Sequence, residues 1–236
     1  YDMTETSAAV IVKRSAPRLR RTILLTPGNR AERLAKAASL NVDAVAFDLE
    51  DGVGPEQKAD ARRIVAEQLA AIDFGHRERV VRVNAITTPE FTRDLAALPF
   101  ERLETLFIPK VETAEELERL DIQLDEIEQR TGRRTPVDII ATIETPRGLL
   151  NALPIVDASR RVSALFFGSG DYSAATGGAV TERALAFPRA TIVAAASAAG
   201  IQPIDAAYFV AVKDAAATAA DAEIAKELGF VGKVIF

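Results

Sequence analysis

Short apolar runs, separated by polar or glycine-containing segments, recur along the whole chain. The runs are four to seven residues long and show little alternation between apolar and polar positions, which is typical of strands buried on both faces. Strands of this kind belong to parallel sheets. The eight runs are Thr22–Thr26, Ala44–Leu49, Val80–Asn84, Leu106–Lys110, Val137–Ile143, Ala164–Phe167, Ile201–Ile204 and Val231–Phe236.

Between these runs lie segments with helical spacing of their apolar residues. The expected helices are Arg30–Leu40, Pro55–Ala71, Pro89–Leu98, Ala114–Arg130, Pro146–Leu153, Thr181–Ala199 and Lys213–Leu228. Alternation of strand and helix requires parallel strands joined by crossovers, and eight repeats favour an α/β fold of the (β/α)8 TIM-barrel type. An open dinucleotide-binding sheet is the second choice, because Thr26–Arg30 after the first strand lacks the GxGxxG fingerprint.

The chain is long and apolar enough for one full core. With 236 residues and 48% apolar content, we expect a single barrel domain over residues 21–236 and a flexible, solvated arm over residues 1–20. No helical segment follows the last apolar run. We therefore expect a barrel that is truncated after its eighth strand, with its C-terminal helix lacking or not shown.

Composition narrows the classes of partner. The net charge is −5 without a basic stripe, which argues against nucleic acid, and no apolar run approaches the roughly 20 residues of a membrane span. The chain has no cysteine and one histidine, which excludes disulfides, thiolate nucleophiles and most zinc sites. We expect a cytoplasmic protein that binds a small molecule through oxygen, nitrogen or a hard metal ion.

Two acidic residues follow neighbouring strands at the barrel end where active sites form. Glu144 ends the fifth run, and Asp171 closes the glycine-rich segment after the sixth. Carboxylates without nearby cysteine or histidine select a hard cation such as Mg2+, which usually takes one or two protein carboxylates. Two other interpretations stay open: Glu144 could pair with Arg147, and Asp171 could cap a helix that begins near Tyr172.

A second acidic cluster and one arginine follow the second and third strands. Asp48 and Glu50 share one side of their strand and Asp51 begins the turn, so Glu50 is the favoured acid near a metal. A solvated loop is the alternative. Arg82 ends an apolar strand, which suits a two-point grip on a substrate carboxylate, although pairing with Glu50 or Asp51 is equally consistent.

Further groups could contact an anionic substrate. The N–H groups of Ser169 and Gly170 could approach a carboxylate, and Arg21 and Arg147 could meet phosphates. A simple tight turn and ordinary surface arginines would explain the same residues.

Seven segments, taken in order, resemble the citrate lyase β-subunit family of the HpcH/HpaI aldolase superfamily, with the related malyl-CoA and citramalyl-CoA lyases. The resemblance runs from about Arg21 to Lys233. Its segments are RTILLTPGNRAERLAKA, DAVAFDLEDGVGPEQKADAR, VVRVN, FIPKVE, IETPRGLLNA, LFFGSGDYSAATGG and ELGFVGK.

The resemblance implies a Mg2+-dependent barrel enzyme, usually a homotrimer, that cleaves a 3-hydroxyacyl-CoA into acetyl-CoA and a 2-oxo acid such as oxaloacetate, glyoxylate or pyruvate. By resemblance, Glu144 and Asp171 are the metal ligands, Arg82 grips a carboxylate and Glu50 acts near the metal waters. The backbone of Ser169 and Gly170 would hold the carboxylate of the oxo acid.

Three hypotheses follow for the function. The first is the Mg2+-dependent acyl-CoA lyase, and the second is an aldolase that acts on a free oxo acid without CoA. The third is an inactive or structural paralogue that works inside a larger complex. The third is motivated by the end of the sequence at Phe236, because the family normally continues past the ELGFVGK block into a terminal lid.

Overall fold

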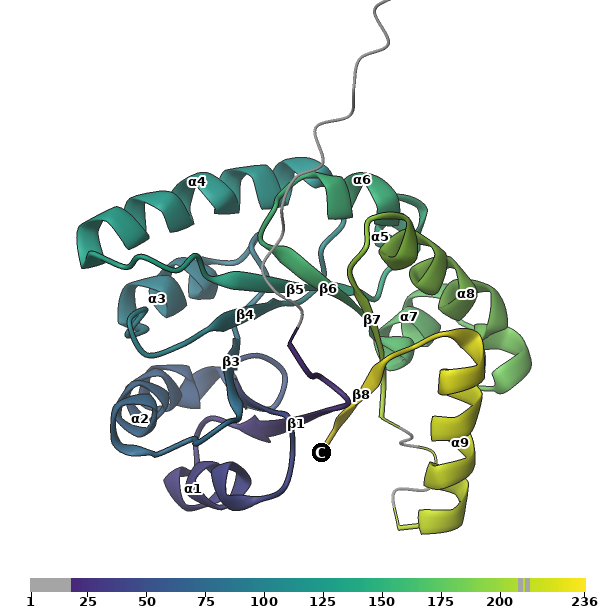
Figure 1. Cartoon of the computed structure of the whole chain (residues 1–236), viewed down its shortest axis with the longest axis horizontal. Helices are drawn as coiled ribbons and strands as arrows, with labels where there is room; N and C mark the ends of the chain where they lie inside the picture. Colours follow the sequence, from purple (N-terminus) through teal and green to yellow (C-terminus); the bar gives the residue numbers. More distant parts are fainter. Residues whose placement is uncertain (1–17, 208–209, 211–212) are drawn as a thin grey trace, which may run out of the picture.

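The computed structural model describes residues 18–207, 210 and 213–236, and these form a closed barrel of parallel strands. Each strand pairs with the next along the chain, and the last pairs with the first, so the ring in Figure 1 has no free edge. The expected (β/α)8 TIM barrel is confirmed. Its strands are β1 (Thr22–Pro27), β2 (Ala44–Asp48), β3 (Glu78–Arg82), β4 (Thr105–Ile108), β5 (Asp138–Ile143), β6 (Val162–Phe167), β7 (Gln202–Asp205) and β8 (Gly232–Ile235).

Helices surround the ring of strands on its outside (Figure 1). They are α1 (Ala31–Ser39), α2 (Lys58–Ala71, preceded by the 3-10 turn η1, Pro55–Gln57), α3 (Pro89–Ala97), α4 (Ala114–Thr131), α5 (Pro146–Leu150), α6 (Ala152–Asp157), α7 (Ser169–Thr176), α8 (Glu182–Ala198) and α9 (Ala215–Leu228). Helix α7 corrects the sequence-based interpretation of a glycine-rich turn before Tyr172. Within the described part of the chain, no helix is long and apolar enough to cross a membrane.

The apolar core has two layers because successive strand residues point to opposite faces. On β5, Ile140 fills the barrel interior, whereas Ile139 and Ala141 pack in the layer beneath the helices. All three side chains are fully buried. Each aliphatic side chain of the size of isoleucine contributes about 1.5–3 kcal/mol when it is buried, which explains why the strands read as continuous apolar runs.

Ion pairs lie across the end of the barrel at which the strands begin. The buried Arg20 donates from Nε and Nη2 to the two carboxylate oxygens of Glu78, at 2.7 and 2.8 Å, and Arg18 binds Glu104 at 2.6 Å. Residues 18–20 therefore pack against this end instead of extending the flexible arm expected over residues 1–20. The rest of that arm, residues 1–17, lies outside the described residues.

Candidate active site

Glu144 and Asp171 meet at the end of the barrel where the strands terminate. Glu144 directly follows β5, and Pro146 then starts α5, whose first turn is capped by the Thr145 hydroxyl accepting the Gly148 N–H at 3.0 Å. Asp171 lies in the first turn of α7, which follows β6. Because β5 and β6 pair along their length, these two turns are neighbours, and Glu144 and Asp171 line the same cavity.

The environment of Glu144 disfavours its negative charge. Burial, with Glu50 and Asp171 close by, raises the pKa of Glu144 to about 8, against the lowering effect of one hydrogen bond from the Lys110 N–H. That bond, 2.9 Å long, reaches Oε1. A β-carbon on Gly168 would lie 2.4 Å from Oε2, so the absence of a side chain there makes room for this oxygen.

This donor set fits a magnesium ion. Mg2+ prefers carboxylate oxygens, needs only one or two of them and keeps water or substrate at its other positions. An ion between Glu144 and Asp171 would offset the charge repulsion that raises the pKa of Glu144. Within the described residues, no group of three or more histidine, cysteine, aspartate or glutamate side chains is arranged to hold a metal.

Arg82 and Asp48 form a two-point ion pair next to these acids. Arg82 Nε donates to Asp48 Oδ1 and Arg82 Nη2 to Oδ2, both at 2.7 Å, and Nη1 lies 3.3 Å from Glu50 Oε2. Arg82 therefore contacts Glu50, one of the two partners considered from sequence, but its main partner is Asp48. Burial opposes the positive charge, yet hydrogen bonding and charge attraction from Asp48 raise the pKa of Arg82 above its ordinary value.

Glu50 lies between two cations. Its Oε1 accepts from Lys110 Nζ at 2.6 Å, and its Oε2 faces Arg82. Burial raises the pKa of Glu50, while Arg82 and Lys110 act in the opposite direction. Its side chain is 5% exposed, so the interpretation of a solvated acidic loop does not hold for Glu50, whereas Asp51 is 58% exposed.

A buried polar cluster supports the loop that carries Glu50. Lys58 Nζ donates to the carbonyl oxygens of Leu49 and Glu50 and to Asn84 Oδ1, at 2.6–2.7 Å. Asn84 Nδ2 in turn donates to Asp94, which is fully buried. Lys58 was not predicted as a site residue. It lies at the start of a helix, and nothing in the local sequence indicates that its ammonium group points back toward the strand ends.

Ser169 and Gly170 occupy the first two positions of α7. The first N–H groups of a helix have no acceptor within the helix, and the N-terminus carries a partial positive charge. Both residues therefore lie, with Asp171, at the same helix end. This placement allows the expected contact with a substrate carboxylate.

The structure does not bring Arg21 and Arg147 to the acids. Arg21 precedes β1, at the opposite end of the barrel, where its guanidinium binds Asp43 Oδ1 and Oδ2. Arg147 is 70% exposed on α5, and its Nε lies 3.8 Å from Glu112. The alternative pairing of Arg147 with Glu144 is therefore not formed.

The paired acids face a cavity of about 550 Å3. Its wall is strongly acidic, and Lys110 is the only lysine or arginine among the lining residues that the structure describes. The charged lining residues are Glu50, Asp51, Lys110, Glu112, Glu116, Glu144 and Asp171.

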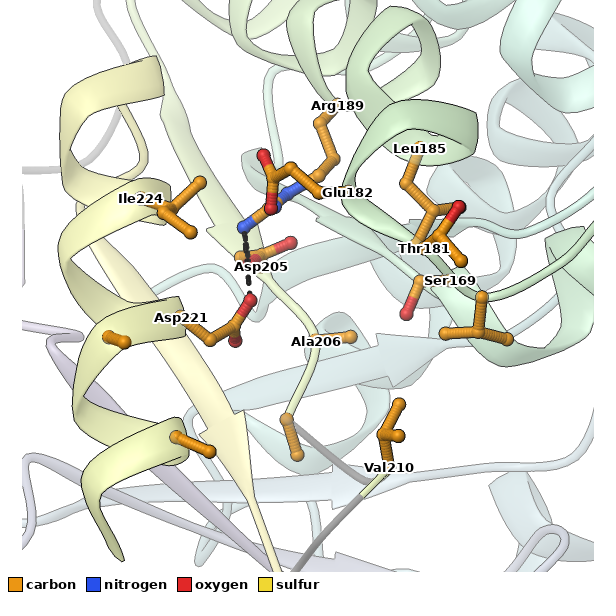
Figure 2. A pocket seen from close by; sticks show the side chains of 14 residues that line it. Ser169, Thr181, Glu182, Leu185, Arg189, Asp205, Ala206, Val210, Asp221 and Ile224 are labelled. Atoms are coloured by element: carbon orange, nitrogen blue, oxygen red, sulfur yellow. Dashed lines mark hydrogen bonds and ion pairs between the residues drawn. The ribbon is translucent and has the colours of Figure 1, made fainter. Parts of the chain in front are cut away.

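A second cavity, of about 340 Å3, lies between α8, α9 and the end of β7 (Figure 2). The charged groups in its wall bind one another: Arg189 Nη2 donates to Asp205 Oδ2 at 2.6 Å, and the dashed line in Figure 2 joins Arg189 to Asp221. Ser169 lines this cavity, so it lies beside the site of Glu144 and Asp171. Its internal ion pairs make it a weaker candidate for chemistry.

The sequence matches the HpcH/HpaI aldolase/citrate lyase family over residues 21–236. The chain belongs to this family. It is 33% identical to the citrate lyase subunit beta of Leuconostoc mesenteroides subsp. cremoris over 219 residues. The aligned region covers 92% of this chain and 72% of that protein. This chain is 32% identical to human mitochondrial citramalyl-CoA lyase, over 92% of its own length and 67% of that enzyme.

A solved structure shows the same fold. The CitE protein of Mycobacterium tuberculosis in complex with magnesium, acetoacetate and coenzyme A superposes with a TM-score of 0.73 at 31% identity, over 94% of this chain and 77% of that one. The resemblance inferred from sequence motifs is thus confirmed. The names of these lyases confirm the expected carbon–carbon lyase class, and a magnesium complex within the family agrees with the expected cofactor.

Proposed function

We propose that the chain is a Mg2+-dependent lyase that cleaves a 3-hydroxyacyl-CoA of the citryl, malyl or citramalyl type into acetyl-CoA and a 2-oxo acid. We further propose that residues 21–236 form one domain, that the enzyme acts in the cytoplasm, and that it is a homotrimer, as the resemblance of its motifs implies. The similarity to a citramalyl-CoA lyase and to a protein bound to magnesium and coenzyme A supports this substrate class.

One observation carries the proposal: Glu144 and Asp171 follow two paired strands and line the same cavity, where the charge of Asp171 is among the causes that raise the pKa of Glu144. Two acids so placed repel each other when both are ionised, and a divalent cation removes that repulsion. Glu144 and Asp171 would hold Mg2+. When bound, the ion supplies a Lewis acid that stabilises negative charge developing on the oxygen atoms of the 2-oxo acid.

The remaining groups would bind and orient the substrate. The N–H groups of Ser169 and Gly170 would donate to the carboxylate of the oxo-acid portion, at the positive end of α7. Arg82, fixed by Asp48, would donate its remaining protons to the same portion. These contacts hold the bond that breaks in one orientation, which lowers the entropic part of the barrier.

Proton transfer falls to Glu50. Cleavage of the carbon–carbon bond requires removal of the proton from the substrate hydroxyl, and the acetyl-CoA enolate that leaves must gain a proton at carbon. Glu50 is the buried acid next to Arg82 and Lys110, and burial raises its pKa above the ordinary value. Glu50 would accept the hydroxyl proton and return it to the enolate.

A CoA-independent aldolase is the second candidate, because the same acids and Arg82 would serve a free hydroxy acid. The cavity beside the acids, of about 550 Å3, has room for such a substrate. The third candidate is an inactive subunit of a larger complex. Such a role would not require the contacts of the buried Glu50 with Arg82 and Lys110.

A substrate panel separates the three candidates. Purified protein with Mg2+ is offered citramalyl-CoA, malyl-CoA and citryl-CoA, and then the corresponding free acids, while acetyl-CoA and 2-oxo acid are measured. We expect turnover of at least one thioester and of none of the free acids, loss of turnover in Glu144→Ala, and unchanged turnover in Glu227→Gln on the exposed side of α9. Turnover of free acids alone would favour the aldolase. An inactive, folded, Mg2+-binding protein that co-purifies with a partner would favour the structural subunit.

A further inference from the structure

Lys110 adopts a backbone conformation that is unusual for its residue type. It follows β4, and its φ angle of 54° is the only positive φ of a non-glycine residue in the part of the chain that the structure describes. L-amino acids avoid this left-handed region because the β-carbon crowds the backbone. Such conformations persist where surrounding contacts enforce them, and they concentrate at functional sites.

The unusual backbone directs two donors of one residue to two different acids. The Lys110 N–H donates to Glu144 Oε1 at 2.9 Å, and the ammonium donates to Glu50 Oε1 at 2.6 Å. Asp51 Oδ2 lies farther from the ammonium, at 3.5 Å. Among the residues that the structure describes, Lys110 is thus the one that donates hydrogen bonds to both the proposed metal ligand Glu144 and the proposed proton carrier Glu50.

The hydrogen bond from the Lys110 N–H also gives the two carboxylate oxygens of Glu144 different surroundings. Oε1 accepts the hydrogen bond from the Lys110 N–H, whereas Oε2 faces Gly168, the residue that directly precedes α7. Lys110 therefore fixes the orientation of the Glu144 carboxyl group, with Oε2 beside Gly168. The ammonium meanwhile supplies the only positive side chain among the residues described in the wall of the acidic cavity.

We propose that Lys110 is a positioning residue of the lyase site, a role that rests on the proposed function. Its N–H orients Glu144 for the metal, and its ammonium fixes Glu50 beside the substrate hydroxyl. The strained backbone is what allows both contacts at once. An ordinary surface ion pair would explain the contact with Glu50, but it would not require the left-handed backbone.

Substitutions at Lys110 separate its two donors. Lys110→Gly keeps the N–H and relieves the backbone strain but removes the ammonium. Lys110→Val removes the ammonium and, because a β-branched residue does not tolerate this φ, also displaces the N–H. Lys110→Arg retains a positive charge at the original backbone geometry. Lys226→Ala, which removes a side chain that is 78% exposed on α9, is the matched control.

Three quantities are measured for each variant: the dissociation constant of Mg2+ alone by calorimetry, the thermal midpoint, and kcat and KM with the CoA thioester that the wild type cleaves fastest. We expect Lys110→Gly to have a higher midpoint and Mg2+ binding at least as tight as the wild type, with kcat lower by about 10- to 100-fold. Lys110→Arg should recover part of that kcat. Lys110→Val should weaken Mg2+ binding by about 10-fold, and Lys226→Ala should match the wild type.

Two results would overturn the inference. One is a Lys110→Gly protein with the kcat of the wild type, and the other is a folded Lys110→Val protein with the Mg2+ affinity of the wild type. If Lys110→Val fails to fold, Lys110→Gly still decides the matter. Failure of the proposed function looks different, because the wild type would then bind no Mg2+ or bind it as well after Glu144→Gln.

Discussion

Asp48 holds Arg82 through two hydrogen bonds of 2.7 Å, one to each carboxylate oxygen. The same carboxylate accepts the N–H groups of Glu50 and Gly52 at 2.8 Å. One buried acid therefore fixes both the arginine and the loop that carries Glu50. A β-carbon on Gly52 would lie 2.3 Å from Asp48 Oδ2, so this close approach also needs the glycine.

Asp48→Asn should destabilise the protein. The amide loses the charge that balances Arg82 and keeps only one acceptor oxygen, so we expect the free energy of unfolding to fall by about 3 kcal/mol. Denaturant titration measures this free energy of unfolding. Asp60→Asn, which changes an acid that is 77% exposed and ion-paired with Arg63, is the control and should shift stability by less than about 0.5 kcal/mol. Equal stability of the two variants would contradict the importance of the pair.

Arg82→Lys should impair catalysis more than binding of the metal. Lysine is a point charge and cannot reproduce the planar two-point contact with Asp48. A shift of the charge by about 1 Å from its place beside the substrate would lower kcat/KM by about 100-fold. Steady-state kinetics with the preferred thioester, together with Mg2+ calorimetry, tests this expectation. A large loss of Mg2+ affinity with unchanged kcat would point to a different role for Arg82.

Gly168→Ala should weaken the metal site. The added β-carbon would lie 2.4 Å from Glu144 Oε2 and 2.6 Å from Glu144 Cβ, so Glu144 must move. We expect Mg2+ affinity to fall by about 10-fold. In Gly178→Ala, the nearest atom, Thr176 Oγ1, is 3.2 Å away, and Mg2+ affinity should not change. The role assigned to Gly168 fails if the two alanine variants bind Mg2+ equally well.

The raised pKa of Glu144 predicts a pH dependence of stability in metal-free buffer. The pKa is about 8 in the folded protein, against an ordinary value of 4.5. Between these values the folded state binds more protons than the unfolded state, so this carboxyl lowers the free energy of unfolding as the pH rises. Relative to Glu144→Gln, which has no such titration, the wild type should lose stability between pH 5 and pH 8. A difference that stays constant over this range would contradict the raised pKa.

The fold could be predicted from sequence because strands buried on both faces leave continuous apolar runs. The run Val137–Ile143 matches β5, and Glu144 falls at its end as expected. Helix α7 was not anticipated from its first residue, since Gly168 and Gly170 are poor helix formers and favour turns. The tertiary position of the segment, directly after β6, outweighs that propensity.

Side-chain partners were harder to predict than strand ends. Arg82 contacts both Asp48 and Glu50, although β2 ends at Asp48 and its alternation does not extend to Glu50. The choice of Asp48 as the main partner of Arg82 depends on the register between β2 and β3, where the two residues are direct neighbours. Lys58 and Lys110 act through long side chains that reach across strands. Sequence spacing does not encode such reach, so Lys58 was missed, and Lys110, although it ends an expected strand, was assigned no partner.

We propose that Glu144 and Asp171 hold the Mg2+ that carbon–carbon cleavage requires. The most direct test follows release of the 2-oxo acid from citramalyl-CoA, or from whichever thioester the wild type prefers, after removal of metal with a chelator and stepwise addition of Mg2+. We expect cleavage to stop without Mg2+, to return when Mg2+ is added, and to be absent at every Mg2+ concentration from folded Glu144→Gln and Asp171→Asn proteins. Cleavage that survives chelation, or that shows the same Mg2+ dependence in these variants, would contradict this proposal.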